Sequence, residues 1–338
     1  MKRLFCKKTG STGHAARLML TLAVMAGFAG AVGAGVGMVA PGPLAAGKTV
    51  IVAHGERAAA IAGQLADAGA VYAGPLFHIA ARLVAPGHLM AGEYDIPAHA
   101  SPLDIARMMR DGKSVVRLFT VAEGLTSAEV VALLNKDAAL TGDVAAIPPD
   151  GSLLPETYRY DFGDTRASLI ARMQKGMREK LAALWAARDG DVPLASPQQA
   201  VILASVVEKE TARPEERPRI AGVFYNRLRI GMRLQSDPTV IYALTHGAGD
   251  LGRALTHGDL AVNSPYNTYV ADGLPPGPIC NPGAASLLAV LHPEHNDYLY
   301  FVADGSGGHA FAASLKAQDD NINHWHAATE SKATGKRK

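Results

Sequence analysis

One stretch near the N-terminus divides the chain into an anchor and a body. Leu18 to Ala40 contains no charged residue, and an apolar helix of that length can cross the hydrocarbon core of a bilayer. Basic residues precede the stretch, which predicts a cytoplasmic N-terminus and a body on the opposite side of the membrane. We therefore expect a basic cytoplasmic segment over residues 1–17, a membrane span over 18–40, a linker over 41–47 and an exported body.

The same stretch is also compatible with a cleaved signal peptide. It is rich in Gly and Ala, and Ala29-Gly30-Ala31 has the small-residue pattern of a signal-peptidase site. We expect a retained single-pass anchor, and both versions export the body. The predicted location is the inner membrane, with the body on its periplasmic, outer side.

Charge argues against one class of partner. The chain has 33 Lys and Arg against 31 Asp and Glu. Nine of the basic residues lie outside the body, before the apolar run or in a basic tail over 331–338: Lys2, Arg3, Lys7, Lys8, Arg17, Lys332, Lys336, Arg337 and Lys338. The body is therefore net acidic, whereas nucleic-acid binders carry a basic footprint.

The two cysteines predict no disulfide. Cys6 precedes the apolar run and Cys280 follows it, so the predicted membrane separates them. Cys280 has no base or partner motif around it, and we expect it to be a small packing residue.

Two globular parts are expected after the linker, and together they make an α+β protein. Residues 48–122 predict a small α+β module, with strands over 49–53, 92–96 and 115–121 and helices over 57–68, 75–84 and 102–110. Residues 123–330 predict a larger mixed α/β domain, with helices over 166–188, from the Ser196-Pro197 cap to Glu208, and over 220–228, a loop at 154–158 and a hairpin turn at 304–308. Thr126 to Glu129 fits a capping box.

The strongest catalytic candidate ends a buried helix. Val201 to Val207 is apolar except for Ser205, and the run stops at Glu208. Glu208 and Glu210 lie about 200° apart on a helix, so they face different directions. Glu208 shares its face with small and apolar residues, which predicts a desolvated carboxyl with the raised pKa that a general acid needs. The alternative is a charge that ends a core helix and pairs with Lys or Arg.

Two downstream segments carry side chains suited to a sugar. Pro238 is expected to hold Asp237 extended, so that Gln235 and Asp237 point to the same side; the alternative for Asp237 is a helix cap. Ser264 to Tyr269 gathers hydroxyls, an amide and two aromatic rings, which match the apolar faces and polar rims of saccharides. The candidates in this segment are Tyr266, Asn267, Thr268 and Tyr269.

Other kinds of site are not favoured. His292 and His295 have no third ligand cluster near them in the sequence, so no metal is expected. The chain lacks the Gly-x-Ser-x-Gly elbow of a serine hydrolase. Asp304 to Gly308 is glycine-rich but has no P-loop lysine. No cofactor is expected.

The motifs after residue 48, in their order, resemble the endolytic murein transglycosylases, the MltG or YceG-like family. The segments that carry the resemblance are Leu154-Pro155-Glu156-Thr157-Tyr158, Glu208-Lys209-Glu210-Thr211, residues 221–228, residues 232–242, Ser264-Pro265-Tyr266-Asn267-Thr268-Tyr269, residues 273–279, residues 298–305 and Gly307-Gly308-His309. The resemblance implies that residues 48–122 form a LysM-like module that contacts glycan; a simple spacer is the alternative. It implies a glycan cleft in the larger domain, with Glu208 as catalytic acid/base and Glu156 among the substrate-binding residues.

The resemblance also implies a reaction. The enzyme would cleave the β-1,4 bond between N-acetylmuramic acid and N-acetylglucosamine in nascent peptidoglycan, leave 1,6-anhydromuramoyl ends and so terminate strand elongation. Peptidoglycan synthases are the implied partners. Two alternatives remain: a muramidase-type hydrolase, with Asp237 or Glu156 handling water, and a non-catalytic glycan-binding scaffold.

Overall fold

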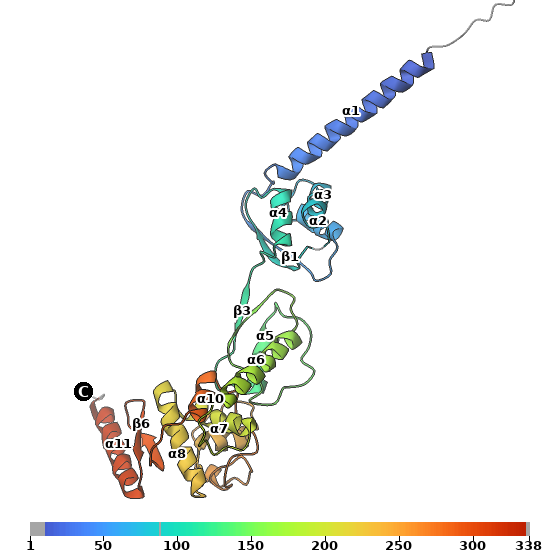
Figure 1. The fold of residues 1–338 in the computed structure, drawn as a ribbon. Coiled ribbons are helices and arrows are strands. Elements are labelled where there is room, and N and C mark those ends of the chain that lie inside the picture. Colours follow the sequence, from blue (N-terminus) through green and yellow to red (C-terminus); the bar gives the residue numbers. More distant parts are fainter. Residues whose placement is uncertain (1–10, 88, 336–338) are drawn as a thin grey trace, which may run out of the picture. The chain divides into compact units, whose positions relative to one another are not determined.

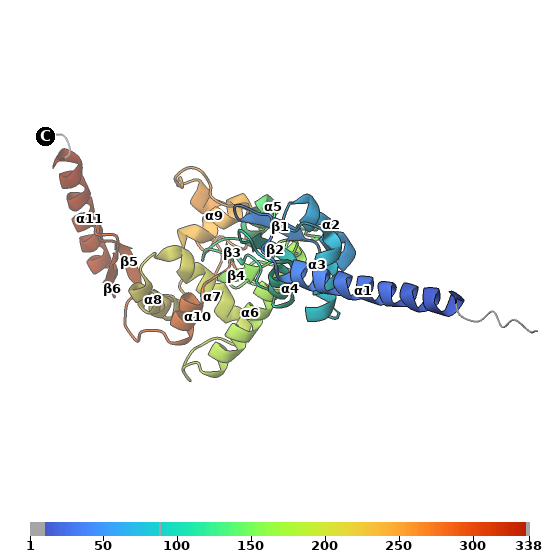
Figure 2. The same cartoon turned by 90° about the horizontal axis from the view of Figure 1, so that it is seen from above.

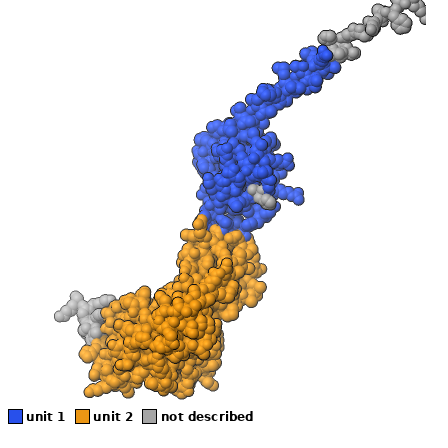
Figure 3. Space-filling model, in the orientation of Figure 1, with its two compact units in different colours: residues 1–117, 161–163 blue, residues 118–160, 164–338 orange. Residues whose placement is uncertain are grey.

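The computed structural model describes residues 11–87 and 89–335, and the side chains of 16–87 and 89–326. The predictions for Cys6, for most of the basic N-terminal segment and for the basic tail fall largely outside these residues. By its contacts the chain divides into unit 1, residues 1–117 with 161–163, and unit 2, residues 118–160 with 164–338 (Figure 3). Each unit has its own hydrophobic core. The mixture of helices and short antiparallel strands confirms the predicted α+β class.

Unit 1 begins with a long apolar helix, α1 (Ser11–Val39). Its segment Ala16–Val39 is long and apolar enough to cross a membrane, by length and composition. A signal sequence would look the same, so retention of the anchor stays a prediction. The last turns of α1 pack against α3 (Gly74–Val84) and α4 (Pro102–Arg110), and a Cβ added at Gly37 would lie 3.1 Å from Leu76. The helix is therefore in direct contact with the globular part of unit 1.

The globular part of unit 1 is a strand pair covered by helices (Figure 1). Its remaining elements are β1 (Lys48–Val52), α2 (Ala58–Asp67) and β2 (Gly92–Ile96). β1 and β2 pair antiparallel from Lys48↔Ile96 to Val52↔Gly92. The helices and the first two strands lie within a residue or two of their predicted positions. The LysM-like identity of the module and its contact with glycan stay predictions.

Unit 2 is built around one buried helix. Its elements are β3 (Arg117–Thr120, whose first residue belongs to unit 1), α5 (Ser127–Lys136), β4 (Thr157–Tyr160), α6 (Arg166–Ala186), α7 (Pro197–Glu210), η1 (Pro214–Glu216), α8 (Arg217–Arg229), α9 (Asp237–Thr245), η2 (Asp259–Ala261), α10 (Ala284–Leu291), β5 (Tyr300–Ala303), β6 (His309–Ala312) and α11 (Leu315–Gly335). α7 contacts α6, α8, α9 and α10 (Figure 2), and every residue from Ala200 to Val207 is buried. α7 therefore fixes whatever its C-terminal end presents.

The predicted helix starts are confirmed by their caps. Ser196 accepts a hydrogen bond from the backbone N–H of Gln199 at 3.3 Å, with Pro197 in the first turn of α7. Thr126 and Glu129 form the predicted capping box of α5. α7 itself continues to Glu210, two residues beyond its predicted end. Both glutamates therefore belong to the last helical turn.

The strand β4 is absent from the prediction, which made residues 154–158 a loop. β4 pairs with β3, and Val121 next to β3 donates its backbone N–H to the carbonyl of Glu156 at 3.0 Å. Thr and Tyr favour extended structure, but the pairing partner lies far away in the sequence, and a strand this short has no periodic signal of its own. The prediction was wrong for the end of this segment.

The C-terminal region is a hairpin backed by a helix. β5 and β6 pair antiparallel, and α11 packs against both (Figures 1 and 2). At the turn, Asp304 donates its backbone N–H to the carbonyl of Gly308 at 2.9 Å, which confirms the predicted hairpin turn. The hairpin places His309 near the end of α7.

Candidate active site

The last turn of α7 carries two glutamates that meet different surroundings. Glu208 and Glu210 are two positions apart on a regular helix, so their side chains diverge by about 200°. Glu208 faces α8 and the segment before α10, whereas Glu210 faces the segment before α9. The two carboxyls can therefore have different chemical roles although the same helix holds them.

Glu208 is the buried partner of an ion pair. Its Oε1 accepts from Nη2 of Arg217 at 2.9 Å, and only 4% of the Glu208 side chain and 8% of the Arg217 side chain are exposed. Its Oε2 accepts from the backbone N–H of Gly283 at 2.9 Å. Both carboxyl oxygens therefore have protein partners. This is the arrangement that the alternative interpretation of Glu208 anticipated.

The same ion pair connects three segments of unit 2. Arg217 begins α8, and its Nη2 also lies 3.4 Å from Oε2 of Glu123. Gly283 precedes α10, which packs on α7. Nearby Cys280 is fully buried and its thiol contacts the carbonyl of Ser205 at 3.3 Å; burial, with the charge of Glu208, raises the pKa of the thiol well above its ordinary value. Cys280 is thus confirmed as a packing residue.

Glu210 has the raised pKa that the sequence predicted for Glu208. Burial raises the pKa of the Glu210 carboxyl to about 7, and the negative charge of Asp237 adds to the effect. The hydrogen bond from the Ser236 hydroxyl to Oε1 of Glu210, together with the charges of His309 and Arg227, opposes it. A carboxyl that is part protonated near neutral pH can give up a proton and take it back.

Ser236 is held in place by buried hydroxyls. Its backbone N–H donates to Oγ1 of Thr268 at 3.0 Å, and its carbonyl accepts from Oγ1 of Thr239 at 2.6 Å. The two threonine hydroxyls lie 2.9 Å apart. Ser236, Thr239 and Thr268 are all buried. The hydroxyl that contacts Glu210 therefore has a fixed position.

The segment around Ser236 corrects one prediction. Asp237 is the first residue of α9, and Ser236 is the extended N-cap, with φ −102° and ψ 117°. Pro238 is tolerated there because the N–H it lacks has no partner in the first helical turn. Gln235 has φ 48°, a left-handed conformation that is uncommon outside glycine. The expected extended alternation of Gln235 and Asp237 is therefore wrong, although both residues are exposed and flank Ser236.

Asp237 and Tyr269 form a second polar pair beside Glu210. The Tyr269 hydroxyl donates to Oδ1 of Asp237 at 2.6 Å. Burial raises the pKa of Tyr269 above its ordinary value, and the hydrogen bond to Asp237 and the charges of Asp237 and Glu210 add to this. The structure thus brings together Glu210, Ser236, Asp237 and Tyr269, which we call the Glu210 cluster.

Three other predicted site residues have structural contacts. Asn267 is fully buried, and its amide donates to the carbonyls of Leu260 and Val262 while its oxygen accepts from the backbone N–H of Tyr269 at 3.0 Å. Thr268 holds Ser236 as described. Tyr266 packs against Tyr242, with ring centroids 4.8 Å apart. These contacts shape the loop that carries Tyr269.

Glu156 lies elsewhere in unit 2. It is exposed just before β4, and its negative charge contributes to the raised pKa of Tyr158. Its described contacts belong to the β3–β4 region and not to the Glu210 cluster.

A cavity of about 370 Å³ lies between α5, the end of α7 and α9, and its lining includes none of the four residues of the cluster. It is lined by Lys209 and Pro238, the sequence neighbours of Glu210 and Asp237, together with Tyr242 and Glu129. Among the residues that the structure describes, no group of three or more His, Cys, Asp or Glu is placed to hold a metal ion.

Glu210 and Ser236 are the residues that the sequence did not single out. The signal available was the second glutamate of Glu208-Lys209-Glu210 and the serine between Gln235 and Asp237. Neither residue is distinguished locally, because the contact joins positions 26 apart in the chain.

Comparisons with known proteins agree on one family. The profile of the YceG-like family matches residues 50–324. An endolytic murein transglycosylase of Bacillus subtilis is 38% identical over 169 residues, covering 50% of this chain and 46% of the relative. One from Streptococcus pneumoniae is 28% identical over 320 residues, covering 80% and 57%. The chain thus spans about half the length of the curated relatives it matches. A crystal structure of a YceG-like protein from Listeria monocytogenes, 30% identical, has a TM-score of 0.50 and covers 81% of this chain and 98% of that one.

Proposed function

Because the chain belongs to the YceG-like family, we propose that it is an endolytic lytic transglycosylase that cuts peptidoglycan glycan strands. The names of the curated relatives support this activity. The observation that carries the proposal is the Glu210 carboxyl, whose pKa is raised to about 7 beside Ser236, Asp237 and Tyr269.

Glu210 is the proposed general acid and base. Its side chain is desolvated without an ion-pair partner in the described part of the chain, and the side-chain hydrogen bond that it accepts there comes from the neutral Ser236 hydroxyl. A carboxyl near pKa 7 is half protonated at neutral pH, which suits a group that must act in both directions. General acid–base catalysis of this kind typically contributes about 10²- to 10⁴-fold to the rate.

The proposed reaction needs only this carboxyl. Protonated Glu210 gives its proton to the oxygen that bridges N-acetylmuramic acid and N-acetylglucosamine, as the bond from that oxygen to C1 breaks. The carboxylate then takes the proton of the muramoyl 6-hydroxyl, whose oxygen forms the new bond to C1. The product is a 1,6-anhydromuramoyl end, no water is consumed, and Glu210 is protonated again.

Glu208 has a structural role in this proposal. The assignment of catalysis to Glu208 stays a prediction, since no activity distinguishes the two glutamates. Its two oxygens are occupied by Arg217 and Gly283, which favours a structural role at the junction of α7, α8 and α10. We therefore transfer the acid/base role to Glu210.

Exposed residues next to Glu210 are the proposed glycan contacts. Gln235 and Asp237 are exposed and flank Ser236, and Tyr269 is partly exposed and donates to Asp237. Asn267, Thr268 and Tyr266 support the loop from behind.

A hydrolase is the second candidate, and one observation favours it. Asp237 is a second carboxylate whose charge acts on Glu210, and hydrolytic glycosidases use two carboxyls. In that case Asp237 activates water and the product is a reducing end.

The proposed setting is the periplasmic face of the inner membrane. In this proposal α1 is a retained membrane span, which is supported by the length and apolar composition of Ala16–Val39, and the body faces the growing wall. Cutting nascent strands there ends their elongation, which makes peptidoglycan synthases the proposed partners.

Product analysis tests the activity. The full-length chain and the variants Glu210→Gln and Glu208→Gln are incubated with purified peptidoglycan, and the released glycans are measured by mass spectrometry. We expect anhydro products, one water lighter than hydrolysed strands, from the wild type and from folded Glu208→Gln, and none from Glu210→Gln. Reducing ends would establish the hydrolase, and binding without cleavage would establish the scaffold.

A further inference from the structure

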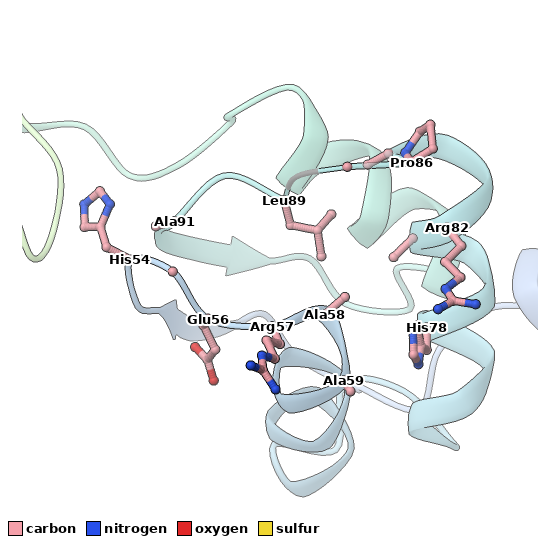
Figure 4. Close-up of a pocket in the computed structure, with 14 residues that line it drawn as sticks. His54, Glu56, Arg57, Ala58, Ala59, His78, Arg82, Pro86, Leu89 and Ala91 are labelled. Carbon is pink, nitrogen blue, oxygen red and sulfur yellow. The ribbon is translucent and has the colours of Figure 1, made fainter.

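Unit 1 contains a cavity of about 850 Å³ that the cleavage chemistry does not use. It lies between the start of α2 and the second half of α3, as Figure 4 shows. Arg57 and Glu56 project into it from the α2 side, while His78 and Arg82 project from α3. Charged and imidazole groups from two elements therefore line one cavity.

The two arginines of this cavity have no partner among the residues that the structure describes. Neither the Arg57 nor the Arg82 guanidinium makes an ion pair or hydrogen bond with any residue that the structure describes. In contrast, Arg107 and Arg110 on α4 of the same unit pair with Asp104 and Asp111. An arginine presents a fork of N–H donors that fits phosphate and carboxylate, so two unpartnered forks across a cavity favour an anion.

The acidic residue of the cavity does not neutralise this pair. Oε2 of Glu56 accepts from the backbone N–H of Ala53 at 3.1 Å, and its Oε1 accepts from Nε2 of Gln64 at 2.6 Å. The carboxylate is thus bound to its own loop and to α2. The two guanidinium charges exceed the one carboxylate charge, so the cavity keeps a net positive charge.

The first backbone N–H groups of α2 also favour an anion in this cavity. Ala58 and Ala59 are the first two residues of α2 and line the cavity. N–H groups at these positions have no partner within the helix, and the positive end of the helix dipole favours an anion there. No side chain caps this helix start.

An apolar groove continues from the cavity. A second cavity of about 560 Å³ shares Ala59, His78 and Arg82 with the first and runs between α2 and α3. Its walls include Ala62, Gly63, Pro75 and Ile79. Ile79 is 43% exposed, so part of this apolar surface faces solvent. The site therefore combines a cationic head with an apolar extension.

The lining favours a lipid over a sugar. None of the residues described as lining either cavity is Phe, Tyr or Trp, whereas saccharide sites commonly stack a sugar on an aromatic ring. The position is also suitable, because α1 packs directly against α3. A site on α3 is thereby close to the helix that is long and apolar enough to cross a membrane.

We propose that this cavity binds the phosphate headgroup of an anionic membrane lipid, with Arg57 and Arg82 on the phosphate and the apolar part of the lipid in the groove between α2 and α3. The proposal rests on α1 being a retained anchor and is independent of the reaction at Glu210. Binding would hold unit 1 against the membrane surface.

Lipid binding by the full-length chain tests the proposal. The protein in non-ionic detergent is titrated with short-chain phosphatidylglycerol, short-chain phosphatidylcholine or inorganic phosphate, and bound molecules are counted by native mass spectrometry. We expect phosphatidylglycerol to bind more tightly than phosphatidylcholine. The double variant Arg57→Gln/Arg82→Gln should lose at least tenfold in affinity for phosphatidylglycerol, and the matched control Arg107→Gln should lose none.

Further variants separate the sources of the phosphate. Ile79→Ser, on the groove and away from the arginines, should weaken binding of phosphatidylglycerol and leave that of inorganic phosphate unchanged. Equal effects on both ligands would indicate a site for free phosphate and overturn the lipid. Equal affinity of the double variant and the wild type, or displacement of the lipid by a muropeptide at a lower concentration, would overturn it as well. Thermal unfolding verifies that each variant is folded, and loss of cleavage at Glu210 has no bearing on these outcomes.

Discussion

The two sides of the last turn of α7 place the same side chain in opposite environments. Glu208 is buried against Arg217 and the N–H of Gly283, so its charge is compensated. Glu210 is partly buried, lies against a neutral hydroxyl and is near the negative charge of Asp237, so its charged form is disfavoured. Two residues of separation on a helix thus divide a structural ion pair from a carboxyl suited to proton transfer. Burial alone does not make a carboxyl a general acid; the charge of the group that it contacts determines whether its protonated form is favoured.

The activities of the matched variants give the largest expected difference. Glu210→Gln should lower kcat about 10³-fold, within the range for loss of a general acid, because an amide cannot supply the proton. If Glu210 is the acid, Glu208→Gln should retain kcat within about tenfold when the rate is expressed per folded molecule, because Arg217 and the N–H of Gly283 already occupy the Glu208 carboxyl. Release of anhydro glycans measures both rates.

Glu215→Gln, an exposed position just after α7, controls for the loss of one negative charge. The comparison reverses if folded Glu208→Gln is inactive while Glu210→Gln is active. In that case the catalytic role belongs to Glu208, as the sequence suggested.

Loss of the Glu208 carboxylate should lower the free energy of unfolding more than loss of a carboxylate from a surface ion pair. Glu208→Gln removes the charge that compensates buried Arg217, and such a loss costs about 3 kcal/mol. The matched control is Glu294→Gln, which breaks the ion pair between Glu294 and Arg219. Arg219 lies on α8, as Arg217 does. The side chains of Glu294 and Arg219 are 37% and 40% exposed, so the cost should stay below about 1 kcal/mol. Urea unfolding gives both free energies, and equal losses would show that the Glu208 pair is no more important than a surface pair.

Local signals predicted most of the fold. Thr126 and Ser196 begin helices in the structure as the sequence predicted, because an N-cap is recognised by residues only three positions apart. β4 was missed because its identity depends on β3, and nothing within Thr157–Tyr160 indicates that pairing. Sequence reasoning succeeded where the stabilising contact was local.

The candidate site follows the same rule. The sequence indicated that one glutamate at the end of α7 would have a raised pKa, but the apolar face of Glu208 could not reveal that Arg217 would occupy it. Ser236 was overlooked between Gln235 and Asp237 because its importance comes from Thr239, Thr268 and Glu210. The sequence and the tertiary contacts thus favour different glutamates of the same motif, and the assignment of catalysis to Glu208 stays a prediction.

The pH dependence of the free energy of unfolding tests whether the folded chain disfavours the charged form of Glu210. Its pKa is about 7 in the folded chain against 4.5 ordinarily, so between these values the folded state binds more protons than the unfolded state. The stability that the protonated group contributes is complete below about pH 4.5 and is lost as the pH rises through about 7. The free energy of unfolding of Glu210→Gln, relative to the wild type, should therefore increase across this window and level off above it.

Glu215→Gln, which removes an exposed carboxyl, should show no such increase. Urea unfolding at several pH values gives the measurement. A difference between Glu210→Gln and the wild type that stays constant with pH would mean that Glu210 titrates alike in both states. The contrast with Glu208 would then be one of contacts only.

The smallest effects should come from the neighbours of Glu210, and they should have opposite signs. The Ser236 hydroxyl lowers the pKa of Glu210 and the charge of Asp237 raises it. If Glu210 must be protonated to act, kcat/KM falls as the pH rises through its pKa. Ser236→Ala should therefore move this fall to higher pH, and Asp237→Asn should move it to lower pH.

These opposite shifts distinguish direct electrostatics from a general disturbance of the loop. Both side chains lie at the start of α9, and a loosened loop would lower activity for both variants without moving the pH of the fall in different directions. Tyr269→Phe supplies the intermediate case, because it removes the hydroxyl that donates to Asp237 while the charge of Asp237 remains. We expect its profile to stay closer to the wild type than that of Asp237→Asn. Shifts of the same sign for Ser236→Ala and Asp237→Asn would contradict the proposed tuning of Glu210 by these two neighbours.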